Sequence, residues 1–76
     1  MKDVLELIIK NLVENKEEVS ISETIDNDKV VFAIKVNQKD MGRIIGKEGK
    51  VANAIRTLMK SLGSTEKKKV SVQFID

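Results

Sequence analysis

The sequence predicts an α+β fold, a two-layer sandwich of order α-β-β-α-α-β in which three helices cover one face of a three-stranded mixed sheet. The chain has 76 residues, which we interpret as one domain over residues 1–76 with a modest core. Helical signals and alternating apolar residues follow one another in that order. A short turn makes the first two strands antiparallel, and a two-helix crossover makes the second and third parallel.

The first helix is predicted over residues 4–13, where leucine and isoleucine fall at helical spacing behind an acidic first turn. Its apolar arc is unusually wide, because Leu7 and Val13 extend it on either side. A helix buried on two sides explains this arc, and so does a surface for self-association or for a partner. We favour burial on two sides.

Three segments have the signals of β-strands. Residues 19–25 and 70–75 alternate between apolar and polar side chains, whereas residues 30–36 are apolar on one face and partly apolar on the other. The second pattern is typical of a central strand, and the short turn DNDK joins it to the first strand. The side chains expected on the apolar faces are Val19, Ile21, Ile25, Val30, Phe32, Ile34, Val36, Val70, Val72 and Phe74.

Two helices are predicted between the second and third strands. Asn37 is placed to cap a short helix over about residues 39–45, which Gly46 interrupts. The next helix covers about residues 50–62, and Gly63 is expected as its C-cap. Its buried stripe is expected to consist of Val51, Ile55, Leu58 and Leu62, with Ala52 and Met59 beside it.

Composition narrows the classes of function. The chain has no histidine and no cysteine, so the usual catalytic bases, thiol nucleophiles and zinc ligands are missing from the sequence. We therefore expect a protein that is not an enzyme and that needs no cofactor or metal. No signal peptide or membrane span is recognisable, which predicts a cytoplasmic protein.

Charge is divided unequally along the chain. Residues 1–38 hold five lysines and eight acidic residues, a net charge of −3, whereas residues 39–76 hold nine basic and four acidic residues, a net charge of +5. A basic half around a glycine-rich segment suggests a polyanionic partner. Lysines that merely keep a small domain soluble explain the charge equally well.

The segment MGRIIGKEGK, residues 41–50, holds three of the four glycines. A nucleotide-binding P-loop is excluded by spacing, and because Glu48 follows Lys47 where serine or threonine is needed. Glycines at both ends of residues 46–49 allow a sharp turn and the close approach of another backbone. The N-terminus of the next helix favours an anion, and Arg43, Lys47 and Lys50 add positive charge. This pattern favours a nucleic-acid backbone over a plain helical corner, where one glycine normally suffices.

The stretch IIGKEGKVANAI resembles the I-G-x-x-G core of KH domains, which bind single-stranded RNA and DNA with a GXXG loop that clamps about four nucleotides. The helix and strand ahead of the loop resemble the type II KH arrangement. Over essentially its whole length, the chain is similar to the KhpA family of small stand-alone bacterial KH proteins.

The resemblance implies a site for RNA. Residues 46–49 would contact the sugar-phosphate backbone, and bases would lie in an apolar groove beside the loop, with Ala52, Ile55 and the strand at residues 32–34 as its walls or floor. Asn53 and Arg56 would reach base edges. The RNA-binding residues implied in this way are Arg43, Ile44, Ile45, Gly46, Lys47, Glu48, Gly49, Lys50, Asn53 and Arg56.

Several features qualify this assignment. Glu48 cancels part of the local charge and Ala52 is small for its place in the groove, so we expect modest affinity and little base selectivity. Gly42 lies outside the clamp and is expected to let the short helix pack closely. The run of lysines at residues 67–69 is interpreted as a solvated loop in preference to a secondary phosphate contact. Exposed aromatic residues for stacking are scarce, since the chain has two phenylalanines and no tyrosine or tryptophan.

The family resemblance also implies a biological role: an RNA chaperone or post-transcriptional regulator tied to cell elongation and shape. It implies a homodimer, or a complex with the larger KH-containing partner KhpB. The alternative is a protein-interaction or structural subunit whose GXXG loop no longer binds RNA, and Glu48 and the low net charge support it.

Overall fold

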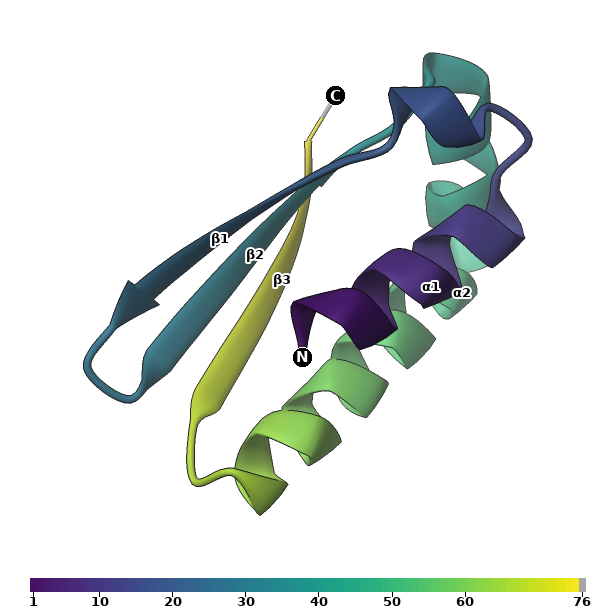
Figure 1. The fold of residues 1–76 in the computed structure, drawn as a ribbon. Helices are drawn as coiled ribbons and strands as arrows, with labels where there is room; N and C mark the ends of the chain where they lie inside the picture. The colour runs from purple at the N-terminus through teal and green to yellow at the C-terminus, as the bar shows by residue number, and fades with distance from the viewer. Residues whose placement is uncertain (76) are drawn as a thin grey trace.

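The computed structural model describes residues 1–75, apart from the side chain of Lys47. Its elements are α1 (Lys2–Leu12), the 3-10 helix η1 (Lys16–Glu18), β1 (Ser20–Asp26), β2 (Lys29–Lys35), α2 (Gln38–Thr65) and β3 (Lys69–Ile75). The strands lie in the order β1-β2-β3, with β2 antiparallel to β1 and parallel to β3. Figure 1 shows α1 and α2 on the same face of this sheet. The predicted fold class is confirmed.

The helix α2 covers the segment in which the sequence predicts two helices. Within it, Glu48 and Gly49 have φ angles of 64° and 71°, whereas an α-helix needs φ near −63°. These two residues therefore divide α2 into two right-handed segments. The division lies in the predicted GXXG loop at residues 46–49, called the glycine loop below. It comes two residues later than the predicted interruption at Gly46.

The core lies between the sheet and the helices. Phe32, in the central strand, pairs with Glu23 of β1 and with Val72 of β3 and is fully buried. The four apolar side chains predicted for this face of the central strand are all buried. The buried hydrophobic residues are Leu5, Ile9, Val13, Val30, Phe32, Ile34, Val36, Met41, Ile44, Ala52, Ile55, Met59, Val70 and Val72.

The prediction that the first helix is buried on two sides is wrong. Leu7 is 65% exposed, and Val4 and Leu12 are each about 40% exposed, because α1 lies outermost and packs through one stripe only. Ile25 is 58% exposed as well, since the β1–β2 hairpin extends beyond the helices (Figure 1). The outer part of the apolar arc therefore faces solvent.

The ends of α2 are fixed by different means. The side chain of Asn37 accepts a hydrogen bond from the Lys39 amide at 2.9 Å, which confirms the predicted N-cap. The predicted C-cap at Gly63 is wrong, because the helix continues to Thr65. Lys67, with φ of 58°, and Lys68 donate to the carbonyls of Ser64 and Gly63, the pattern of a Schellman motif.

Gly63 is instead a packing residue. A Cβ atom at this position would collide with the side chain of Val70 and would lie 2.9 Å from the Lys68 carbonyl oxygen. Glycine therefore lets the last turns of α2 approach the start of β3.

The buried carboxylate of Asp40 joins the first helix to α2. Asp40 is 1% exposed and accepts hydrogen bonds of 3.1 Å from the Glu14 amide, the Asn15 amide and the Asn15 side chain. The bond from the Glu14 amide is the main cause that lowers the pKa of Asp40 below its ordinary value, and the bonds from Asn15 and the charge of Arg43 add to it. The first segment of α2 is thereby held in place ahead of the glycine loop.

Among residues 1–75, no helix has both the length and the apolar character needed to cross a lipid bilayer.

Candidate nucleic-acid interface

The glycine loop is open on its outer side. A Cβ atom added to Gly46 would meet nothing within 4 Å, so the fold itself does not require glycine there. Gly49 differs, because its φ of 71° lies in the left-handed region that favours glycine. The two glycines of the clamp thus have separate roles: Gly46 leaves space above the backbone, and Gly49 permits the turn.

Gly42 does not have its expected role. A Cβ atom there would also meet nothing within 4 Å, and the residue is exposed. The expectation that it allows close packing of the short helix is therefore wrong.

The glycine loop carries both negative and positive side chains. Glu48 and Lys50 are both exposed, and Glu48 adopts the left-handed conformation, which costs a residue other than glycine about 1–2 kcal/mol. The side chain of Lys47 lies outside the described residues, so its predicted contact with phosphate stays a prediction.

Arg43 is held on the side of α2 that faces α1. Its Nη1 atom lies 2.8 Å from Oε1 of Glu14, and this carboxylate is the main cause that raises the pKa of Arg43. Both side chains are more than half exposed, so water screens the pair and its release costs little. The role of Arg43 as a phosphate partner also stays a prediction.

Asn53 and Arg56 lie together on the second segment of α2. Nη1 of Arg56 donates to Oδ1 of Asn53 at 3.1 Å, and Nε of Arg56 donates to the Val72 carbonyl at 3.3 Å. The guanidinium carbon lies 5.3 Å from the centre of the Phe74 ring, a cation–π distance. Arg56 therefore bridges α2 and β3, with Asn53 between it and the loop.

The wall of the groove beside α2 is β3, not the strand at residues 32–34. That strand is central, as its apolar pattern predicts, and its residues Phe32 and Ile34 are fully buried, so it can form only the floor of the groove. Arg56 and Lys60 face Val70, Ser71 and Val72 across a hollow of about 170 Å³.

The aliphatic residues implied for the groove divide into two groups. Ile44, Ala52 and Ile55 are at most 4% exposed, so they can serve only as its floor. Ile45 is 46% exposed and is the accessible aliphatic side chain next to Gly46.

Sequence reasoning missed Lys60, Phe74 and the edge of β3. A signal was available for Lys60, because positions 49, 53, 56, 60 and 64 recur at helical spacing and share one face of α2. The strand order β1-β2-β3 also makes the third strand an edge.

The arrangement is suited to binding. In the part of the chain that the structure describes, no group of three acidic, histidine or cysteine side chains could hold a metal ion. Its notable features are an open loop, an arginine and a lysine beside a sheet edge, and an exposed aliphatic residue. All of these suit contact with a flexible polyanion.

Comparisons with known proteins point in one direction. A family model described as "KhpA/KhpB, KH domain" matches residues 2–74. The RNA-binding protein KhpA of Clostridium perfringens is 41% identical over 75 residues, which cover 99% of this chain and 100% of the relative. RNA-binding protein KhpA of Clostridium acetobutylicum is 43% identical with the same coverage. That of Chlamydia caviae is 45% identical over 76 residues, 100% of this chain and 97% of the relative. No solved structure shows significant similarity.

Proposed function

The chain belongs to the KhpA/KhpB family of KH domains, which confirms the resemblance inferred from the sequence, and we propose that it binds single-stranded RNA without catalysing a reaction. RNA lies with its sugar-phosphate backbone against residues 46–49 and with its bases toward the groove between α2 and β3. The observation that carries this proposal is the open space above Gly46 beside the left-handed turn at Glu48 and Gly49.

The geometry of the loop supports a backbone contact. The left-handed turn at Glu48 and Gly49 leads into the second segment of α2, and the start of a helical segment favours an anion. Because Gly46 has no side chain and nothing lies above it, a phosphate can come close to the main chain. Lys50 and Lys47 supply positive charge, and Arg43 adds to it once it leaves Glu14.

The side chains that contact the bases are those of Asn53, Arg56 and Ile45. Asn53 and Arg56 offer an amide and a guanidinium group for base edges, and Ile45 offers apolar contact. The acid at Glu48 opposes phosphate, and in the described residues the one half-buried aromatic ring, that of Phe74, is occupied by Arg56. We therefore expect modest affinity, little base selectivity and a marked dependence on salt.

We place this activity in the cytoplasm, as that of an RNA chaperone or post-transcriptional regulator in the control of cell elongation and shape. The RNA-binding part of this role is supported by relatives named RNA-binding protein KhpA. The cellular part is supported by family resemblance alone.

A second candidate function is protein interaction, in which the GXXG loop no longer binds RNA. The exposed side chains of Val4, Leu7 and Leu12 on α1 favour it, because they offer an apolar surface to a second copy or to a larger KhpB-like partner. The name of the family model includes KhpB.

One experiment separates the two candidates. The double variant Lys47→Asp, Glu48→Asp makes the loop acidic, and we expect its affinity for a fluorescent oligouridine to fall at least about tenfold. The matched control, Lys2→Asp with Glu17→Asp, makes the same charge change far from the loop and is expected to bind as the parent does. Equal RNA binding by both variants, with unchanged circular dichroism, would overturn the clamp and leave the interaction role.

A further inference from the structure

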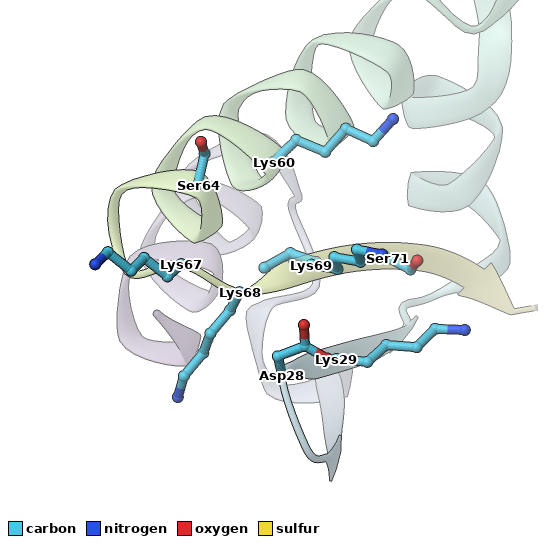
Figure 2. Close-up of a pocket in the computed structure, with 9 residues that line it drawn as sticks. Asp28, Lys29, Lys60, Ser64, Lys67, Lys68, Lys69 and Ser71 are labelled. Atoms are coloured by element: carbon cyan, nitrogen blue, oxygen red, sulfur yellow. The ribbon is translucent and has the colours of Figure 1, made fainter.

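A lysine-lined cavity lies at the far end of α2 from the glycine loop (Figure 2). It has a volume of about 610 Å³. The residues that line it are Asp28, Lys29, Lys60, Ser64, Lys67, Lys68, Lys69, Val70 and Ser71. Five lysines against one aspartate give it a strongly positive potential, which is suited to a polyanion.

The fold itself brings these lysines together. The Schellman motif at the end of α2 fixes the backbone of Lys67 and Lys68. The Lys69 amide donates to the Asp28 carbonyl at 2.7 Å and so joins the start of β3 to the β1–β2 turn. Neither salt bridge that the structure shows within residues 1–75 involves these five lysines, and Asp28 is the one acid that lines the cavity beside them.

The cavity is continuous with the groove of the candidate RNA site. The hollow between Arg56 and β3 shares Lys60, Val70 and Ser71 with it. In Figure 2 the ammonium groups of Lys60 and Lys29 extend in the direction in which β3 runs, and those of Lys67 and Lys68 lie on the other side. Positive groups therefore stand at both ends of the opening.

A stripe on α2 links the cavity to the loop. Gly49, Asn53, Arg56, Lys60 and Ser64 follow one another at intervals of four, three, four and four residues, so they share one face of the helix. From Gly49 to the end of α2 at Thr65, a rise of 1.5 Å per residue gives about 24 Å. A strand stacked at about 3.4 Å per nucleotide covers this distance with about seven nucleotides, more than the roughly four that a GXXG loop clamps.

We propose that an RNA strand held at the glycine loop continues along this stripe and places its phosphates in the lysine cavity, so that the footprint is about seven nucleotides. The proposal rests on the proposed function, because the loop supplies the first contact. It gives the lysine run at residues 67–69, interpreted from the sequence as a solvated loop, a role in binding.

The test compares a uridine tetramer with a uridine octamer by fluorescence anisotropy over a range of salt concentrations. For the parent chain, we expect the octamer to bind at least about tenfold more tightly than the tetramer. The triple variant Lys67→Gln, Lys68→Gln, Lys69→Gln should lose most of this gain and bind the tetramer within about twofold of the parent, because none of these lysines lines the hollow beside Arg56. The slope of log K against log salt for the octamer should fall in magnitude by about 2, which is about 0.7 for each lost contact.

The control is Lys2→Gln, Lys10→Gln, Lys35→Gln, which removes the same charge elsewhere and should keep the octamer gain. An octamer no tighter than the tetramer would overturn the extended footprint and leave the clamp intact. A cavity variant that binds the octamer as the parent does would overturn it as well. Failure of the parent to bind either oligomer would overturn the clamp and this extension together.

Discussion

At the scale of single residues, the four glycines lie in three kinds of environment. Gly42 and Gly46 lie in open space, Gly49 takes a left-handed conformation, and Gly63 fits against Val70 and the backbone of Lys68. Only the last two are needed by the fold, one for its φ angle and the other for its lack of a side chain. The fold leaves the absent side chains of Gly42 and Gly46 unexplained, and of these two only Gly46 belongs to the loop at residues 46–49.

We predict that Gly63→Ala destabilises the protein by about 1–3 kcal/mol, the usual cost of an overfilled contact. The Val70 side chain can move, but the Lys68 carbonyl belongs to the backbone that closes the Schellman motif. The free energy of unfolding in urea measures the effect. A Gly63→Ala variant as stable as the parent would show that α2 does not depend on close approach to β3.

At the scale of elements, two contacts position the site from opposite sides. Asp40 ties the first segment of α2 to the end of α1 through Glu14 and Asn15. Arg56 ties the second segment to β3 through Val72 and Phe74. The glycine loop lies between these two anchored segments, so its left-handed turn is held without the help of a ligand.

The lowered pKa of Asp40 predicts a dependence of stability on pH. In the unfolded chain Asp40 binds a proton near its ordinary pKa of 3.8, whereas in the folded protein it does so only at lower pH. The contribution of Asp40 to the free energy of unfolding is therefore complete above about pH 5. It is lost as the pH falls below 3.8 and passes through the pKa of Asp40 in the folded protein.

The variant Asp40→Asn tests this. Its amide has one acceptor oxygen in place of two and presents an NH₂ group to backbone donors, so we expect lower stability at pH 7 and a shallower loss of stability between pH 5 and pH 3. Urea unfolding of the parent and variant at these pH values isolates Asp40 from the other acids. Parallel pH profiles would show that this carboxylate does not stabilise the fold through its charge.

At the scale of the whole molecule, local patterns predicted the architecture well. Asn37 marked the start of α2, the short turn DNDK marked the hairpin, and the apolar face of the central strand identified the core. These features depend on residues close in sequence or on a simple period, and the structure confirms them.

Features that depend on tertiary contact were not predicted. Gly63 looked like a C-cap because it follows an apolar stripe, but its contact with Val70 depends on how β3 returns beside α2. The pairing of Arg56 with Phe74 depends on the relative positions of a helix and a strand, which periodicity does not give. The exposure of Leu7 depends on which face of α1 meets the core.

The central claim is that Gly46 is a glycine because RNA approaches its backbone, and one pair of variants tests it. In both Gly42→Ala and Gly46→Ala the new methyl group meets nothing within 4 Å, so each should fold and gain up to about 1 kcal/mol from the better helix former. We predict that Gly46→Ala lowers the affinity for a uridine octamer at least about tenfold, a loss of about 1.4 kcal/mol, whereas Gly42→Ala binds as the parent does. Octamer binding by Gly46→Ala equal to that of Gly42→Ala would contradict the account.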